Sequence, residues 1–232
     1  QQLRRSRRDL SHLLESTVLI LVAISMISLA AVTDMYLHRG VESGSVMPYV
    51  VQPSGRELST NVDMRGLTQD QIESVAGTLA SSGYGFVRHE VSWAQVEAVE
   101  GEFDWSEYDP IFNALRDHDI GVIAVIVDSP EWSWAGNMIP SEVQPPADPQ
   151  SLGPFSRELT SHYSGTVRFV QLWHMPNLAS RWGGVPATGE SFRPYLSATF
   201  YGARSGNAEV QIVLPEAAMH SDVPEGLGDL EF

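Results

Sequence analysis

The sequence predicts an α/β protein of parallel strands and intervening helices, preceded by one transmembrane helix. Strand-like and helix-like patterns alternate from residue 59 onward, which is the first observation behind this fold class. The second is that the strand candidates include continuous apolar, β-branched runs, typical of a sheet buried on both faces. The third is an uncharged apolar run at residues 16–33. Because no hairpin signal separates the strand candidates, we expect right-handed βαβ connections.

The composition restricts the functional classes. The chain is 43% hydrophobic, which is typical of a globular protein and too high for a disordered one. It contains no cysteine, so disulfides and thiolate metal sites are excluded. Residues 34–232 hold ten arginines against 27 acidic residues, a net charge of −17. Because binding to a phosphate backbone needs clustered basic residues, we expect no nucleic-acid partner.

The N-terminal segment has the pattern of a membrane anchor. Residues 1–15 form a basic tail with the motif LRRSRRDL, and residues 16–33 are apolar. A helix over the apolar run would be about 27 Å long, close to the roughly 30 Å hydrocarbon core of a bilayer. We therefore predict a transmembrane helix at residues 16–33. Since arginine-rich flanks stay in the cytoplasm, the tail is expected to be cytoplasmic and the rest of this single-pass protein periplasmic or extracellular.

This segment has two other interpretations. A cleaved signal peptide has the same arginine-rich start and apolar run, and Ala30 and Ala31 suit a cleavage site. We expect an uncleaved anchor because the segment is part of this chain. A buried core helix is disfavoured because the run has no polar face. Residues 34–58, of mixed polarity with prolines and glycines, are interpreted as a linker to a domain at residues 59–232.

Within this domain the predicted strands and helices alternate. Strands are expected at 60–64, 84–91, 120–128, 166–173 and 208–216, and helices at 68–83, 106–118, 155–165 and 191–206. In the first helix, Thr68 and Gln71 have the spacing of a capping box. Gly83 is expected to end this helix. Its apolar residues fall on one face at helical spacing: Ile72, Val75, Ala76, Leu79 and Ala80.

Two architectures fit this alternation. A doubly wound sheet normally has a glycine-rich phosphate turn after its first strand, and the segment NVDMRGLTQ has none. A (β/α)8 TIM-barrel-like domain is therefore favoured, in which the chemistry lies on loops after the strand carboxyl ends. Five βα units cannot close an eight-stranded barrel. We therefore expect either further strands after this C-terminally incomplete domain or a partner on the open sheet edge.

Three spaced motifs resemble the retaining glycoside hydrolases of the cellulase and β-xylosidase clan, which are (β/α)8 barrels. They are GFVRHEVSWAQVEAVEGEFDWSEYD, GVIAVIVDSPEW and FVQLWHMPNL followed by RWGG, in the same order as in that clan. The resemblance implies that Arg88 corresponds to the arginine that supports the nucleophile. It implies that Trp93 and Trp132 correspond to aromatic residues lining the cleft, and that Asn177 corresponds to the asparagine after the proline.

The sequence departs from this clan at the catalytic position. In the clan, an asparagine and the acid–base glutamate follow the fourth strand, and here His174 and Met175 hold those places. Methionine has no titratable proton, so it cannot act as a general acid. Retaining hydrolysis needs two carboxyl groups about 5–5.5 Å apart. The second one would follow a seventh strand, which this sequence does not reach, so no catalytic residue is assigned.

Other groups at the strand ends were considered as replacements or as sugar contacts. His174, Asp128, Glu90 and Glu131 lie on neighbouring strand ends, although Asp128 and Glu131 flank a proline turn and suit capping of backbone amides. Trp173 is expected in the core. Trp132, Trp134 and Trp182 are expected at the rim of the cleft. The candidate carbohydrate-binding residues are Arg88, Trp93, Glu131, Trp132, Asn177 and Trp182.

Metal and cofactor chemistry has little support in the sequence. The seven histidines show no HxH, HxxxH or HExxH spacing. His89, His174 and His220 would all lie at strand ends of the barrel, so a three-histidine cluster is conceivable. Nucleophile-elbow and phosphate-loop motifs are also missing from the sequence. We therefore expect neither a metal nor a cofactor.

Two functions remain open. In the first, the chain is a membrane-anchored, catalytically inactive relative of these hydrolases that serves as an extracytoplasmic accessory or scaffold subunit of a membrane complex. In the second, it is an active or glycan-binding hydrolase that acts on extracellular polysaccharide. Met175 favours the first. The expected partners are the membrane through residues 16–33, other subunits of a complex and, in the second case, a glycan.

Overall fold

The structure, a computed structural model, describes residues 2–37, 58–134 and 144–218. The chain divides into two units, Gln1–Gly55 and Arg56–Phe232. In the first unit, α1 (Gln2–Leu37) is one continuous helix, and it extends beyond the predicted end at residue 33. Its segment Ser16–Asp34 has a mean hydropathy of 2.3 and is fully exposed. By length and composition this segment could cross a membrane, and a signal sequence has the same properties.

The second unit is built on a parallel sheet of five strands in sequence order. These strands are β1 (Leu58–Asn61), β2 (Tyr84–Ser92), β3 (Gly121–Val127), β4 (Val167–Leu172) and β5 (Gln211–Val213). Strands that are consecutive in the chain pair with each other, from β1 to β5. A doubly wound sheet reverses direction at a switch point, whereas this order does not. Sequential order with parallel pairing is the pattern of a barrel wall.

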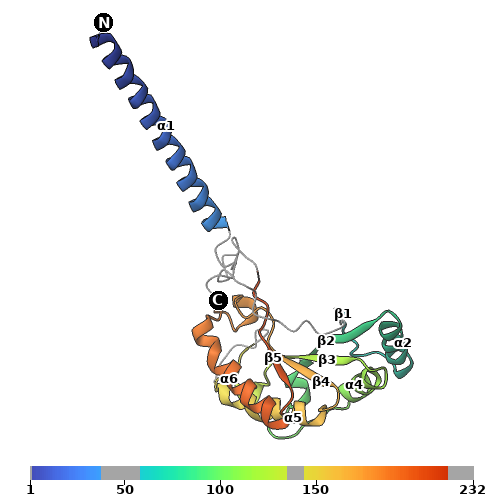
Figure 1. Cartoon of the computed structure of the whole chain (residues 1–232). Helices are drawn as coiled ribbons and strands as arrows, with labels where there is room; N and C mark the ends of the chain where they lie inside the picture. Colours follow the sequence, from blue (N-terminus) through green and yellow to red (C-terminus); the bar gives the residue numbers. More distant parts are fainter. Residues whose placement is uncertain (1, 38–57, 135–143, 219–232) are drawn as a thin grey trace. The chain divides into compact units, whose positions relative to one another are not determined.

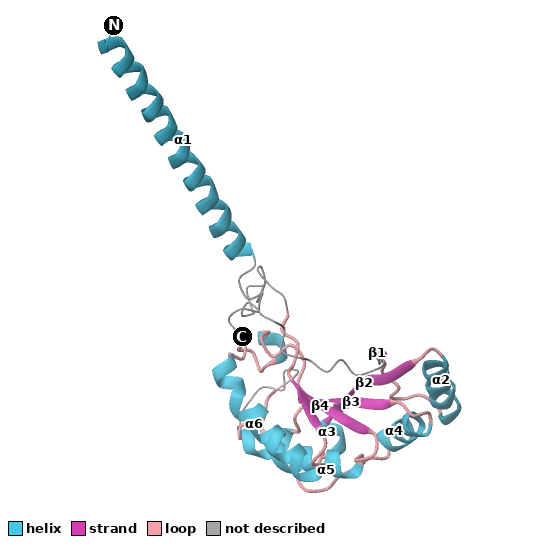
Figure 2. Cartoon of the chain, in the orientation of Figure 1, coloured by secondary structure: helices cyan, strands magenta, loops and turns pink. Residues whose placement is uncertain are grey.

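Helices surround one face of this sheet in an arc (Figure 1). They are α2 (Gln69–Ser81), α4 (Tyr108–Asp117), α5 (Leu152–His162) and α6 (Gly189–Gly206). Shorter pieces follow the strand ends: α3 (Trp93–Val96) and the 3₁₀ turns η1 (Glu131–Ser133), η2 (Pro149–Ser151) and η3 (Ala179–Arg181). Figure 2 shows this layering of helices outside strands. The predicted TIM-barrel-like fold class is therefore confirmed, with five strands of the wall described.

Most predicted elements are present, with shifted boundaries. The capping box of α2 forms as expected: the Thr68 side chain accepts from the backbone N–H of Gln71, and the Gln71 side chain accepts from the backbone N–H of Thr68. β1 begins two residues before its predicted start because Leu58 and Ser59 pair with β2. α5 also begins earlier than predicted. Its first turn continues directly from η2, where the Asp148 side chain accepts from the backbone N–H of Gln150.

The face toward the helices is the hydrophobic core. Alternate residues of the strands, such as Val87, Ala124 and Val170, have no exposed surface and pack under the helices. Close helix packing at α5 and α6 depends on glycine. A Cβ on Gly202 would lie 2.2 Å from the carbonyl oxygen of Gly153, so no larger residue fits there without moving α5. The opposite strand residues face inward, where the polar residues of the sheet gather.

Candidate functional site

Four polar side chains meet on the inner face of the sheet: Arg88, Gln171, His174 and Glu216, which we call the strand-end cluster. Arg88 Nη2 lies 3.1 Å from Glu216 Oε1 and 3.3 Å from Oε2. Arg88 Nε donates to Gln171 Oε1 at 3.1 Å, and Gln171 Nε2 donates to Glu216 Oε2 at 2.7 Å. His174 Nδ1 contacts Glu216 Oε1 and lies 3.5 Å from Arg88 Nη2. The cluster therefore holds one carboxylate among three nitrogen-bearing side chains.

The curvature of the sheet makes this cluster possible. β2 and β5 are separated by β3 and β4, so in a flat sheet they would lie about 14 Å apart, three spacings of roughly 4.8 Å. Arg88 nevertheless bonds directly to Glu216. A sheet that curls as a barrel wall brings side chains on its concave face together, although their strands are not neighbours. The cluster is therefore a product of the barrel geometry.

An unusual turn after β4 positions His174. Trp173 and Met175, on either side of His174, have φ values of 66° and 47°, which few residues other than glycine adopt. Trp173 is 1% exposed, and its indole Nε1 donates to the carbonyl oxygen of Arg181 at 2.6 Å. Its own carbonyl oxygen accepts from Gln171 Nε2 at 2.8 Å. The packed indole and this bond hold the backbone in place, so that His174 reaches Glu216.

The surroundings of Glu216 keep its carboxyl group ionised. Partial burial favours the protonated form and acts to raise its pKa. The backbone N–H of Glu216, the charges of Arg88 and His174 and the Gln171 amide act in the opposite direction, and together they outweigh burial. The pKa of Glu216 is therefore lowered from its ordinary value. A carboxylate of this kind can accept hydrogen bonds near neutral pH, but it cannot donate a proton there.

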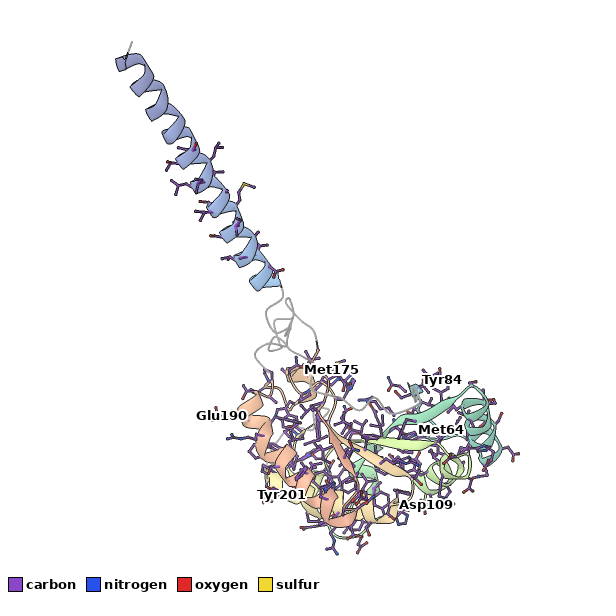
Figure 3. The ribbon with its side chains drawn as sticks, viewed as in Figure 1. Met64, Tyr84, Asp109, Met175, Glu190 and Tyr201 are labelled. Carbon is purple, nitrogen blue, oxygen red and sulfur yellow. The ribbon has the colours of Figure 1, made fainter. Side chains whose placement is uncertain are left out.

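Met175 occupies the position after His174, where the resemblance predicts an acid. Met175 is partly buried, and its backbone is in the left-handed region. Asp128, directly after β3, also has a left-handed backbone, with φ 55°. Figure 3 shows Met175 apart from Asp109 and Tyr201, which belong to the surrounding helices. Strain of this kind is often found at functional sites, where the fold enforces a conformation that the residue disfavours.

Asn177 joins the segments that follow β4 and β5. Its side-chain Nδ2 donates to the carbonyl oxygen of Ala218 at 3.0 Å, and its Oδ1 accepts from the backbone N–H of Ala218 at 2.9 Å. The side chain is fully buried. Asn177 therefore holds the segment that carries Glu216 against the turn that carries His174. Its assignment as a sugar contact stays a prediction.

The tryptophans named as sugar contacts lie mostly within the protein. Trp93 is fully buried, stacks on Phe155, and donates from Nε1 to Glu97 Oε2 at 2.6 Å. Trp132 is partly exposed, and its Nε1 donates to the carbonyl oxygen of Glu97 at 2.8 Å. Trp182 is 8% exposed, so its predicted place at the rim is wrong. It lies among three aromatic rings that the sequence did not connect: Trp173, Phe192 and Tyr195.

Two other carboxylates named from the sequence, Glu131 and Glu90, have different environments. Glu131 is exposed and begins η1. Glu90 lies on the same face of β2 as Arg88, and its Oε2 is 3.8 Å from Arg65 Nη2. Trp134, also predicted at the rim, is partly exposed, and its Nε1 donates to the carbonyl oxygen of Ser129 at 3.1 Å.

The three-histidine cluster considered from the sequence does not form. His89 faces the helices, 6.0 Å from the ring of Tyr108 and 5.7 Å from that of Phe112, whereas His174 is on the inner face. Consecutive strand residues point to opposite faces, so His89 follows Arg88 into the other layer. His220 lies outside the described residues. In the part of the chain that the structure describes, no three His, Asp or Glu side chains are grouped as a metal site.

Sequence reasoning missed Glu216, although it is the centre of the cluster. The residue is the last one of the fifth predicted strand, and the strand-end rule for barrels points to that position. What the sequence lacks is any sign that a residue after β5 reaches Arg88, 128 positions earlier. Only a curved sheet of known strand order supplies that contact.

Comparison with known proteins gives the fold a context. No protein-family model and no curated protein sequence matches the chain. A family 39 glycoside hydrolase from the gut symbiont Bacteroides cellulosilyticus has a similar structure, with a TM-score of 0.56 and 13% identity over 68% of this chain and 31% of that one. A GH5_18 protein from Bifidobacterium longum, solved in complex with Manb1-4GlcNAc, has a TM-score of 0.51 and 14% identity. The match covers 67% of this chain and 43% of that one. A GH5_18 protein from Streptomyces cattleya, solved in complex with GlcNAc, has a TM-score of 0.51 and 12% identity. The match covers 64% of this chain and 39% of that one.

The chain thus spans less than half the length of these structures. At such low identity the likeness is one of fold. The structural neighbours are glycoside hydrolases with TIM-barrel-like folds, as the resemblance implied.

Proposed function

We propose that this chain is a membrane-tethered, glycoside-hydrolase-like protein that does not hydrolyse glycosides and serves as an extracytoplasmic accessory or scaffold subunit of a membrane complex. The observation that carries the proposal is the position after β4. There His174 and Met175 stand at the places where the resemblance puts the residues that bind the sugar and donate the proton.

The chemistry of the strand-end cluster supports inactivity. Cleavage of a glycosidic bond needs an acid that protonates the leaving oxygen, as well as a second carboxylate. Met175 has no proton to give, and Glu216 is held ionised by Arg88 and its other partners. An ionised Glu216 has the charge that a nucleophile needs. Without an acid, however, the oxygen of the leaving group receives no proton. The proposed role requires no metal and no cofactor.

The features of α1 support the membrane tether. The segment Ser16–Asp34 is long and apolar enough to span a bilayer, and four arginines precede it. By the positive-inside rule, the N-terminus lies in the cytoplasm and the barrel-like unit on the periplasmic or extracellular side. The strongly acidic composition of residues 34–232 argues against a nucleic-acid partner.

The open edges of the sheet support partner subunits. Among the described strands, β1 and β5 each pair on one side only. Leu58 on β1 is 51% exposed, and Leu214 directly after β5 is 68% exposed. Unpaired strand edges with apolar residues are covered in stable proteins, either by further strands of the same chain or by another protein.

A hydrolysis assay tests inactivity. The full chain in detergent is expected to release no product from aryl glycosides or cell-wall polysaccharides above the level of a blank. Met175→Glu is expected to stay inactive, because the carboxylate of Glu216 is already bound by Arg88, Gln171 and His174. Met175→Gln is the matched control, since it has the shape of glutamate without the acid. Hydrolysis by the unmodified chain would overturn the proposal.

Removal of residues 1–33 tests the tether. We expect the shortened chain to partition into the soluble fraction after cell lysis, whereas the full chain sediments with membranes. Sedimentation of the shortened chain with membranes would place the attachment elsewhere in the protein.

One observation favours the alternative of an active or glycan-binding protein. Polar side chains and strained backbone gather at the carboxyl ends of the strands, where barrels carry their binding sites. In this case an oligosaccharide would bind saturably, whether or not the chain hydrolyses it. A direct binding measurement on the full chain therefore separates a glycan-binding accessory protein from a scaffold that contacts only protein.

A further inference from the structure

We propose that Arg88, Gln171 and His174 form a carboxylate-binding site, which the chain's own Glu216 fills and which takes the carboxylate of an acidic sugar when Glu216 is displaced. This inference deepens the glycan-binding alternative given under the proposed function and rests on it, because it assigns a ligand class to the strand-end cluster.

The geometry around the carboxylate is that of a binding site with several donors. Glu216 Oε1 is contacted by Arg88 Nη2 and by His174 Nδ1, and Oε2 is contacted by Arg88 Nη2 and by Gln171 Nε2. The partners of the two carboxylate oxygens thus come from three places: β2, β4 and the turn after β4. Charge-assisted hydrogen bonds of this type favour a carboxylate over a neutral hydroxyl group.

The donors are held in place independently of Glu216. Arg88 Nε donates to Gln171 Oε1, which orients the guanidinium group with its Nη2 toward the carboxylate. Gln171 is 3% exposed and also donates to the carbonyl oxygen of Trp173, and the packed indole of Trp173 fixes the turn that carries His174. A site whose donors are already oriented loses little entropy when a ligand binds.

The side chain of Glu216 is the replaceable part, because Asn177 fixes the nearby backbone at Ala218 and not the carboxylate itself. Glu216 lies three residues beyond the end of β5, outside the paired sheet. Its side chain is 37% exposed, whereas that of Arg88 is 19% exposed. Solvent therefore reaches the carboxylate more readily than it reaches the guanidinium group. A soluble carboxylate in the same place would have the same three partners.

The experiment removes the resident carboxylate and supplies another. Glu216→Ala in the full chain, in detergent, is expected to melt at a lower temperature than the unmodified chain. Sodium acetate or sodium glucuronate is expected to raise this melting temperature saturably, by about 2 °C or more, because a ligand that binds only the folded state stabilises it. Sodium chloride at equal concentration and glucose are expected to have no such effect.

Three further variants make the result specific. Glu209→Ala removes an exposed glutamate beside β5 and is expected to show no carboxylate-dependent shift. The double variant Arg88→Gln with Glu216→Ala is expected to lose the shift, because the main cationic partner is gone. If Glu216→Ala does not fold, Glu216→Gln keeps the side chain's shape without its charge, and a smaller carboxylate-dependent shift is expected there.

The outcomes separate this inference from the proposed function. No carboxylate-dependent shift in either Glu216 variant would overturn the carboxylate site and leave the proposed inactivity standing. A shift that survives the loss of Arg88 would also overturn it. Glycoside hydrolysis by the unmodified chain, in contrast, would overturn the proposed function and leave the melting data unchanged.

Discussion

Two neighbouring residues of β2, Arg88 and His89, have opposite environments. Arg88 points to the inner face, bonds to Glu216 and Gln171, and lies 3.5 Å from the ring of His174. His89 points to the helices, is 1% exposed, and lies against aromatic rings of α4. Its Nε2 accepts from the backbone N–H of Met64 at 3.2 Å, and its Nδ1 donates to the carbonyl oxygen of Glu90 at 2.7 Å.

The difference shows how the same sheet treats charge on its two faces. On the helix-facing side burial dominates, so the pKa of His89 is lowered and the ring is neutral with both nitrogens satisfied. On the inner face partners dominate, so Glu216 stays charged. The core therefore gains stability by excluding charge. The strand-end cluster, in contrast, needs every one of its partners.

The largest effect is expected from a cavity in the helix-facing core. Trp93→Ala removes a fully buried side chain that stacks on Phe155, so we expect the free energy of unfolding to fall by about 3–5 kcal/mol. Tyr201→Ala is the control, because Tyr201 is 70% exposed and its loss should change stability by less than about 0.5 kcal/mol. Urea denaturation of the full chain in detergent measures both. Equal effects would mean that Trp93 is not a core residue.

Breaking the strand-end cluster is expected to have an intermediate effect. Arg88→Leu leaves Gln171 Oε1 and the Glu216 carboxylate without their main partner, and we expect a loss of about 2 kcal/mol. Arg116→Leu is the matched control. It removes an exposed arginine whose partners are Asp117 and Asn113, so the loss should be below about 0.5 kcal/mol. A cluster that matters only for binding would show no difference between the two variants.

His89 predicts a dependence of stability on pH. Its folded-state pKa lies below the ordinary value, so the unfolded chain binds a proton that the folded chain does not. This contribution to stability is present above a pH of about 6.5. As the pH falls further it is lost, with a slope of at most about 1.4 kcal/mol per pH unit, until the folded-state pKa is reached.

The pH effect is measured by comparing melting temperatures of the full chain between pH 7.5 and 5.5. His89→Phe should flatten the dependence, because it removes the titrating ring. His118→Gln should leave it in place, since His118 is partly exposed and faces Glu73. If His89→Phe retains the full dependence, another group is responsible.

The smallest effect is expected from hydroxyl groups between α5 and α6. Among the described residues, the hydroxyls of Ser156 and Thr199 are buried without a hydrogen-bond partner. Thr199→Val, which keeps the shape of the side chain, should raise the free energy of unfolding by about 0.5–1 kcal/mol. Thr160→Val is the control. Its hydroxyl donates to the carbonyl oxygen of Ala203 at 2.8 Å, so this change should lower stability instead.

Much of the fold could be predicted because its signals are local. Ile72 and Ala76, on the predicted apolar face of α2, are buried as their spacing indicated. Strand ends were less accurate: β1 was placed two residues late because its boundary depends on pairing with β2. Trp182 was misplaced because the rings that cover it come from α6 and from the turn after β4. Burial of a tryptophan in a loop depends on residues that sequence spacing does not connect.

The sequence by itself determined the alternation of strands and helices and the apolar N-terminal helix. These follow from residue type and from periods of two and 3.6 residues along the chain. The tertiary structure alone decided that Glu216 meets Arg88 and His174, and that His89 is kept apart from them. The physical reason is that the curvature of the sheet and the alternation of its faces set distances between residues far apart in the chain.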